Sequence, residues 1–488
     1  MKLRATLAAQ SERTIMLGII LIASAISAAT AYLLTASYSV DVLGSLLFPS
    51  QDCWLDWGIN IGKHCFSDYS MVVGAGIGPD GIEPNPWEHT HNLPPAYQPG
   101  VVGYPAAGWI PQLLFGIPAH WLGVPALGLI GYLVALTIAV MSPAIWAARG
   151  ARGLECIVVF VALGAAAIPA WAVIDRGNSA GFVVPVALAF FIALRRQRWA
   201  VVTIMVILAA LVKPQFAVMA MVLLAARQWR WGGIAIAGIA TSNIAAFLLW
   251  PRDFPRTIAE SIAANMKYNS SFGGITSTQN VSFGRALLLF PDTIKASQSG
   301  GKVPDDFLSG ARGLIGFVVL ILIVVAVVAL GRRIPPVMAG IVLLATGTLF
   351  PGFAAYYYLV FVLPIAAIIV RDPDGPPGQG IFDQFAAHGD RRRAVGLWLG
   401  IATALSIAQI AMVVSKPAPV PVYGQFGARG EIGTTLLIPT TVALTGILWL
   451  IACIVVIVSY ARRPARLDED DAVQADDQPV GIASAATP

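Results

Sequence analysis

Residues 177–231 read GNSAGFVVPVALAFFIALRRQRWAVVTIMVILAALVKPQFAVMAMVLLAARQWRW, in which apolar runs alternate with short basic turns. The same pattern extends along the chain, whose 488 residues are 57% hydrophobic and only 12% charged. Soluble domains carry about 25% charged residues, and an apolar run of about 20 residues spans a bilayer as a helix. Since a helix satisfies its own backbone groups in lipid, the sequence predicts an all-α polytopic membrane protein.

The basic clusters predict which side of the membrane each turn faces. Lysine and arginine collect in cytoplasmic loops, so the N-terminus at 1–13, the loop at 372–393 and the tail at 461–488 are expected inside the cell. The net charge of +5 resides in such clusters, which does not suggest a nucleic-acid partner. The clusters that define this topology are Arg149 with Arg152, Arg195–Arg198, Arg227 with Arg230, Arg332 with Arg333, Arg391–Arg393 and Arg462–Arg466.

One arrangement that satisfies these clusters places about 12 spans in a single transmembrane domain at 14–460. The external segments are then 37–123, 251–308 and 416–433, and the tail beyond Arg466 is expected to be disordered. The predicted spans lie near 14–36, 124–147, 154–174, 178–194, 199–212, 214–227, 232–250, 309–331, 335–350, 354–371, 394–415 and 434–460.

Two segments can be interpreted in more than one way. Segment 106–121 breaks the parity of the spans if it crosses the membrane, and it contains Pro111 and Pro118, so we expect it to lie in the interface or to re-enter. Segment 199–227 is interrupted by proline after Lys213 and predicts either two short spans or a re-entrant hairpin. No internal repeat is visible, which disfavours the duplicated transporter folds.

The stretch QDCWLDWGINIGKHCFSDYS at 51–70 combines carboxylates with aromatic rings. Asp52, Asp56 and Asp68 can accept hydrogen bonds from sugar hydroxyls, and tryptophan rings can cover the apolar faces of a sugar. The alternative is a solvated loop whose tryptophans anchor it at the membrane interface.

The four cysteines fall into two pairs. Cys53 and Cys65 lie in the first external segment and can form a disulfide in an oxidising compartment. With His64 they could instead form a metal site, but their spacing matches no standard zinc pattern, so no metal is expected. Cys156 and Cys453 lie in apolar runs and are interpreted as inert core thiols.

Charged residues also stand at the ends of the apolar runs. Asp175 and Arg176, followed by Asn178, form either a local ion pair that caps a helix or a site for a lipid phosphate. Lys213, followed by Gln215, is costly between two membrane helices unless it snorkels or has an anionic partner, for which a phosphate is suited.

Two later motifs suggest further contacts with a substrate. Arg285 follows Asn280 in the second large external segment, where it could reach a lipid headgroup. The run Tyr356-Tyr357-Tyr358 opens a predicted span at its external end and fits either an interfacial tyrosine belt or a binding site.

Taken together, these features resemble the GT-C superfamily of membrane glycosyltransferases. They resemble in particular the family 87-like, polyprenyl-phosphate-sugar-dependent mannosyl- and arabinofuranosyltransferases of actinobacteria. The resemblance covers residues 14–371 and rests on the order of its motifs rather than on any one of them. These motifs are the acidic first loop with Tyr97, Pro99, Tyr104 and Pro105, the stretch 177–231, Asn280-Val281-Ser282 with Arg285, and Tyr356–Tyr358 with Pro364.

The resemblance implies a GT-C-type bundle with short interfacial or re-entrant helices in its external loops. It implies transfer of a sugar from a polyprenyl-phosphate donor to an envelope glycan or glycolipid on the external face, with inversion and an aspartate as general base. Asp56 is the first choice for the general base, and Asp52 and Asp68 are the next candidates. Asp41 lies closer to the first span, so the choice among these four aspartates stays open. Residues implied to bind the donor or its phosphate are Lys213, Arg176, Asp175, Asn178, Gln215, Asn280, Arg285, His64, Tyr104, Tyr357 and Tyr358.

Two other classes of function fit parts of the pattern. A transporter or flippase for a lipid-linked or amphipathic substrate shares the spans and the basic residues, but it predicts charge pairs at mid-membrane and internal symmetry. A non-catalytic envelope scaffold predicts that no single acid of the first loop matters. We expect no cofactor, no requirement for a divalent cation, and a multi-pass location in the plasma membrane with both termini cytoplasmic and the active-site loops external.

Overall fold

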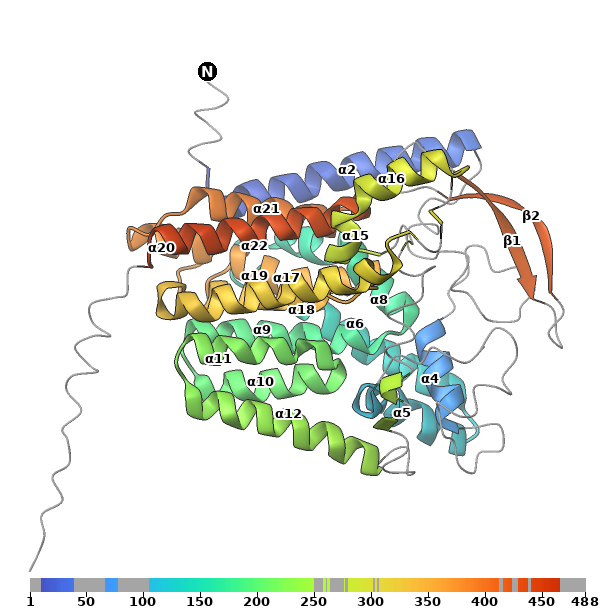
Figure 1. Cartoon of the computed structure of the whole chain (residues 1–488), viewed down its shortest axis with the longest axis horizontal. Coiled ribbons are helices and arrows are strands. Elements are labelled where there is room, and N and C mark those ends of the chain that lie inside the picture. The colour runs from blue at the N-terminus through green and yellow to red at the C-terminus, as the bar shows by residue number, and fades with distance from the viewer. Residues whose placement is uncertain are drawn as a thin grey trace, which may run out of the picture.

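The computed structural model describes most of the chain between residues 10 and 465. The described residues are 10–38, 66–77, 105–249, 258–259, 261–263, 276, 280–301, 303–304, 307–411, 416–423, 429–437 and 440–465. This part is predominantly helical, in agreement with the predicted fold class (Figure 1). It also contains one antiparallel pair of strands, β1 (Lys416–Tyr423) and β2 (Arg429–Leu437).

Five helices in the described part are long and apolar enough to cross a membrane, in keeping with a multi-pass membrane protein. They are α2 (Glu12–Tyr38), α6 (Pro125–Ala148), α12 (Trp229–Leu249), α17 (Ser309–Leu330) and α22 (Thr445–Arg462).

A sixth candidate span is a bent pair of helices. Its first part is α7 (Leu154–Phe160) with the π-helical turn η3 (Val161–Ala165), and its second part is α8 (Ile168–Arg176). The two parts meet at 46°. The π-turn frees a backbone carbonyl, and the indole of Trp171 donates a hydrogen bond of 2.9 Å to that of Ala165.

The remaining predicted spans coincide with shorter apolar helical segments. These are Ser179–Arg195, Trp199–Val212, Pro214–Ala225, Pro336–Leu349, Tyr356–Val370 and Arg393–Ile407. Most of the ranges taken from the sequence are therefore helical, but only the longer helices are long enough to cross a bilayer by themselves. The number of 12 spans stays a prediction.

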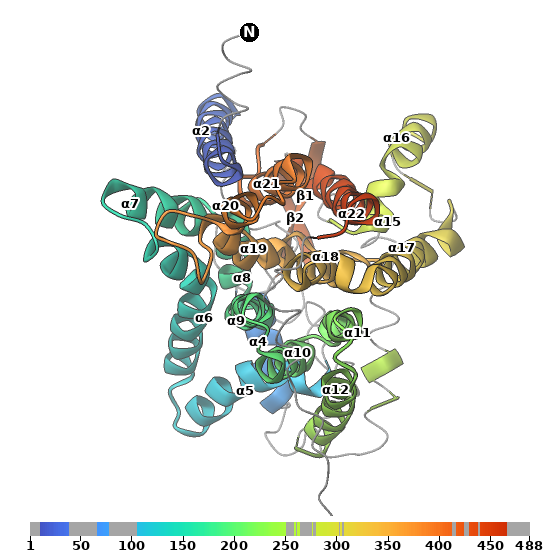
Figure 2. The same cartoon turned by 90° about the vertical axis from the view of Figure 1, so that its left-hand side faces the viewer.

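The most deeply buried helices lie in the middle of the molecule (Figure 2). In α18 (Pro336–Leu349) and α19 (Val362–Val370), every residue after Pro336 is buried, and α9 (Val183–Arg195) packs against both. The longer helices surround this core and expose apolar side chains, as α17 does with Leu314, Phe317, Ile321 and Leu322. A helix that is apolar on all sides is stable only in a core or in lipid.

The basic turns gather at one end of the bundle, at the left of Figure 1 near α20 (Ile381–Ala387). Ion pairs join them: Arg195 lies 3.0 Å from Asp372, Arg13 lies 2.5 Å from Glu155, and Arg463 lies 2.7 Å from Asp390. Clusters that the charge rule assigned to one side of the membrane thus lie at one end of the fold. The compartment that this end faces stays a prediction.

The two ambiguous segments are both helical. Segment 106–121 forms the single helix α5 (Ala106–Trp121), and it packs against α4 (Ser67–Ile77) at the end opposite the basic turns. Segment 199–227 folds into α10 (Trp199–Val212), the 3-10 turn η5 (Pro214–Ala220) and α11 (Met221–Ala225).

The last predicted span is confirmed as a candidate span at Thr441–Arg462, but its start differs from the range taken from the sequence. Residues 416–433 were expected to be loop and 434–460 a span, but β2 continues to Leu437, and helix begins only at Thr441 with the 3-10 turn η9 (Thr441–Leu444) before α22. The prolines of β1 stand at alternate positions in KPAPVPVY. Proline lacks a backbone N–H and is tolerated in strands that lie at the edge of a sheet, as each strand of a two-stranded sheet does.

Candidate functional site

Four elements meet at the end of the bundle opposite the basic turns. They are α4, the C-terminus of α8, the turn at Lys213 and the 3-10 turn η7 (Tyr356–Phe361). Helix α8 ends at Gly177, whose φ of +63° is left-handed and favours glycine. A Cβ at Gly177 would lie 2.8 Å from the Cβ of Tyr69, so α4 can approach this turn only because the residue is glycine.

Asp68 lies at the centre of this site. Arg176 donates two hydrogen bonds to its carboxylate, each 3.0 Å long, and Asn178 donates a third of 2.6 Å. All three side chains are largely shielded from solvent. The acid and the base come from segments 108 residues apart, so two residues that the sequence suggested for separate roles form one ion pair.

The tyrosine run supplies two aromatic rings to the same cations. The guanidinium carbon of Arg176 lies 4.8 Å from the ring centre of Tyr357, and the ammonium of Lys213 lies 5.5 Å from that of Tyr358. Tyr357 is only 4% exposed, whereas a tyrosine of an interfacial belt presents its ring to lipid. These contacts pack the run against cations of the protein itself, and its role in binding stays a prediction.

Lys213 is a buried cation at the junction of two helical segments. It follows α10 in extended conformation and precedes η5, and only 4% of the residue is exposed. Burial lowers the pKa of Lys213 from 10.5 to about 7, while the charge of Asp68 opposes this shift and that of Arg176 adds to it. An anion that arrives beside Lys213 would favour its protonated form. We refer to Asp68, Arg176, Asn178, Lys213, Tyr357 and Tyr358 as the Asp68 cluster.

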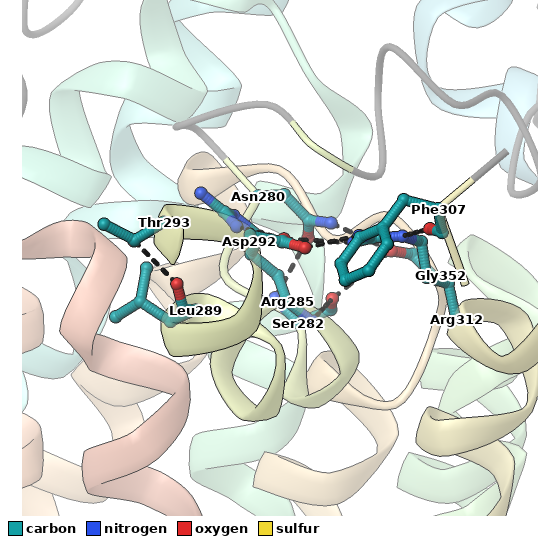
Figure 3. A network of polar contacts seen from close by, with 9 residues as sticks. All are labelled: Asn280, Ser282, Arg285, Leu289, Asp292, Thr293, Phe307, Arg312 and Gly352. Atoms are coloured by element: carbon teal, nitrogen blue, oxygen red, sulfur yellow. Dashed lines mark hydrogen bonds and ion pairs between the residues drawn. The ribbon is translucent and has the colours of Figure 1, made fainter. Parts of the chain in front are cut away.

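Asn280 holds the tyrosine turn in place from a second network (Figure 3). Its side-chain nitrogen donates to the carbonyl of Gly352 at 2.9 Å, and its side-chain oxygen accepts from the N–H groups of Ser282 and Ala354, both at 3.0 Å. A backbone bridge joins Asn280 to Ala355, the residue before the tyrosines. Asn280 is therefore a positioning residue for η7.

Arg285 lies in the same network and pairs with an acid. It donates a hydrogen bond of 2.5 Å to Asp292, and Asp292 also binds Arg312 (Figure 3). The headgroup contact suggested for Arg285 from the sequence therefore competes with an internal ion pair.

The other predicted residues are placed as follows. Asp175 is buried in the last turn of α8 beside Arg176, and the backbone of Gln215 packs on α18 at Gly347. Several predicted site residues lie outside the described residues: Asp41, Asp52, Asp56, His64, Tyr97, Pro99, Tyr104 and the predicted disulfide pair Cys53 and Cys65.

Two contacts that support the site could not be predicted from the sequence. Tyr132 of α6 donates a hydrogen bond of 2.8 Å to the carbonyl of Gly177, and Gln112 of α5 makes a longer contact of 3.5 Å with the same oxygen. Both side chains are fully buried, and they brace the turn that carries Arg176 and Asn178. In the sequence, Tyr132 and Gln112 each stand out only as a polar residue within an apolar helix. Such a residue does not by itself indicate its hydrogen-bond partner.

The residues that the structure describes contain no group of three or more histidine, cysteine, aspartate or glutamate side chains that could hold a metal ion. Compared with known family models, with curated proteins and with solved structures, the chain gives no match. Its function is therefore inferred from the Asp68 cluster and the residues that position it.

Proposed function

We propose that this chain is a membrane glycosyltransferase that moves a sugar from a polyprenyl-phosphate donor to an envelope glycan or glycolipid. The observation that supports this most is the placement of Lys213 and Arg176, each against a tyrosine ring, at the end of the bundle opposite the basic turns. Two shielded cations beside aromatic rings suit the phosphate and the sugar of such a donor.

The proposed reaction is a single displacement with inversion. The acceptor hydroxyl oxygen attacks the anomeric carbon, the bond from that carbon to the phosphate oxygen breaks, and the hydroxyl proton passes to a carboxylate. The polyprenyl phosphate leaves with an additional negative charge, which Lys213 and Arg176 would stabilise. Because phosphate is a good leaving group, no strong general acid is needed.

Asp56 remains the proposed general base, with Asp52 in reserve. Asp68 is less suited to that role because its oxygens already accept three hydrogen bonds from Arg176 and Asn178. Its proposed role is to hold Arg176 in position. This divides the acids of the first external segment between proton transfer and positioning.

The proposed membrane topology follows from the charge asymmetry of the bundle. The basic end faces the cytoplasm with both termini, and the Asp68 cluster faces outward from the plasma membrane. In a GT-C-type arrangement, about 12 spans, some of them short, would connect these two ends across the membrane.

The decisive experiment compares purified wild type with Asp56→Asn and Lys213→Gln in detergent. Each protein is incubated with labelled polyprenyl-phosphate sugars and a crude envelope glycolipid acceptor, with Lys295→Gln as the matched control for loss of a lysine outside the cluster. Wild type and the control should transfer label, Asp56→Asn should not, and Lys213→Gln should transfer at least tenfold more slowly.

A different result would redirect the assignment. Transfer retained by folded Asp56→Asn would move the base to Asp52 or Asp41. Absence of transfer together with movement of the labelled lipid across vesicle membranes would identify a flippase and reject the transferase.

A further inference from the structure

Two guanidinium groups share one carboxylate where the second large predicted external segment leads into α17. Asp292, in α16 (Leu289–Gln298), binds Arg285 from α15 (Phe283–Leu287) at 2.5 Å and Arg312 from α17 at 3.0 Å, and Arg312 makes a second bond to its other oxygen. Asp292 is 2% exposed and Arg312 1%. The group links α15, α16 and the start of α17 (Figure 3).

The two arginines differ in how many hydrogen bonds their guanidinium groups make. Arg312 donates to both oxygens of Asp292 and, at 2.9 Å, to the carbonyl of Phe307, and it also lies over the Phe307 ring at 5.7 Å. Its pairing with Asp292 is bidentate, the arrangement that matches a guanidinium to a carboxylate. The charge of Asp292 is therefore already balanced by Arg312.

Arg285 keeps most of its hydrogen-bonding capacity. A guanidinium has five N–H groups, and a single one of them, on Nη1, donates to Asp292. Within the described residues its other side-chain N–H groups have no partner. The side chain is 13% exposed, and burial lowers the pKa of Arg285, although Asp292 opposes this. A charge that is partly desolvated and shares its counter-ion is incompletely compensated.

Arg285 is also held in place before any ligand arrives. Its backbone N–H donates to the hydroxyl of Ser282 at 3.2 Å, which caps α15. Ser282 is in turn fixed to the carbonyl of Gly352 at 3.2 Å and to Asn280. A positioned guanidinium with unused donors is the group that proteins employ to bind a phosphate in two-pronged fashion.

We propose that Arg285 is the anion-binding residue of a second site, distinct from the Asp68 cluster, which takes a phosphate group. Asp292 orients the guanidinium, and Arg312 neutralises Asp292 so that Arg285 retains its attraction for an anion. The phosphate can belong to a phospholipid headgroup or to a free phosphate. The inference does not depend on the chain being a glycosyltransferase.

The test uses the full-length protein in a neutral detergent, in a Lys213→Gln background that weakens binding at the Asp68 cluster. Binding of inorganic phosphate and of short-chain phosphatidylglycerol is measured by titration calorimetry, with short-chain phosphatidylcholine, which is zwitterionic and has no net charge, as the comparison. Adding Arg285→Gln should weaken binding of the anionic probe at least tenfold, because a charge-assisted, two-pronged contact is lost. Arg332→Gln, which removes an exposed arginine at the basic end of the bundle, should leave it unchanged.

The outcomes distinguish the two sources of the phosphate. Binding of phosphatidylglycerol alone supports a headgroup, and binding of both probes supports a free phosphate group. Arg285→Gln should fold because Arg312 still pairs with Asp292, and Arg285→Lys, which keeps the charge without the fork, should bind with intermediate strength. Binding that is equally strong with and without Arg285, or absent from the protein that retains Arg285, overturns the proposal.

Discussion

At the scale of single residues, the site is centred on the carboxylate of Asp68. Asp68 binds Arg176 and Asn178 directly and influences Lys213 through its charge, so one carboxylate influences most of the polar groups of the cluster. Removing it would take a two-pronged partner from Arg176 and a nearby negative charge from Lys213.

The first prediction concerns the stability that this ion pair provides. Asp68→Asn should lower the free energy of unfolding by about 3 kcal/mol, because it breaks a buried, two-pronged ion pair with Arg176. The matched control is Arg196→Gln, which breaks the exposed pair with Asp374 and should cost less than about 1 kcal/mol. Thermal unfolding in detergent measures both. Equal shifts of the two midpoints would show that Asp68 does not hold the site together.

The second prediction concerns pH and uses the lowered pKa of Lys213. The groups that act on Lys213 include Asp68, Arg176 and the ring of Tyr358. With a pKa of about 7, Lys213 is protonated below neutral pH and neutral above it. Affinity for a phosphate ester at this site should therefore fall as pH rises through 7, and binding should take up a proton because the anion raises the pKa of Lys213 again.

Titration calorimetry in buffers of different ionisation enthalpy measures that proton uptake directly. Lys213→Gln should show neither the uptake nor this part of the pH dependence. A wild-type affinity that is the same on both sides of neutrality would contradict the lowered pKa or the role of Lys213 as the phosphate ligand.

At the scale of helices and turns, the site depends on how α8 ends. Gly177 has a left-handed backbone and also lies against α4, whereas Gly123, with a φ of +72°, has nothing within 4 Å of the position that a Cβ would take. The two positions therefore separate backbone strain from crowding. This contrast gives the third prediction.

Gly177→Ala should destabilise the protein by about 3 kcal/mol, while Gly123→Ala should cost only the backbone term of about 1 kcal/mol. The excess arises because the new methyl group would push α4, and with it Asp68, away from Arg176. Unfolding midpoints give the difference in stability, and the loss of phosphate binding in Gly177→Ala alone reports the displaced ion pair. Similar values for both variants would indicate that α4 yields without strain.

The elements also show what the sequence could predict. Most of the apolar runs bounded by basic turns are helices, because their hydrophobicity and the break at Lys213 are local signals. The π-turn at Val161–Ala165 and the strands β1 and β2 were missed, since the first has no distinctive residue and the second resembles a proline-rich loop. The pairing of Asp68 with Arg176 joins distant segments, so no local pattern could reveal it.

At the scale of the whole molecule, charge is distributed unequally between the two ends of the bundle. The basic turns and their ion pairs occupy one end, and the Asp68 cluster with the Arg285 network occupies the other (Figure 1). The buried core of α18 and α19 lies between them. A lipid-linked donor presented on one leaflet can therefore reach the cluster only if that end faces the same leaflet.

The fourth prediction tests this orientation in intact cells. In a background without the four natural cysteines, Ser297→Cys on α16 and Gln197→Cys at the basic end each place one exposed thiol. A membrane-impermeant maleimide should label Ser297→Cys in intact cells and Gln197→Cys only after permeabilisation, because basic turns stay in the cytoplasm. Labelling of both thiols from outside would contradict a cytoplasmic basic end. The reverse pattern would place the Asp68 cluster inside the cell and would remove the external polyprenyl-phosphate donor as the substrate, since its phosphate would then lie on the wrong side of the membrane for Lys213.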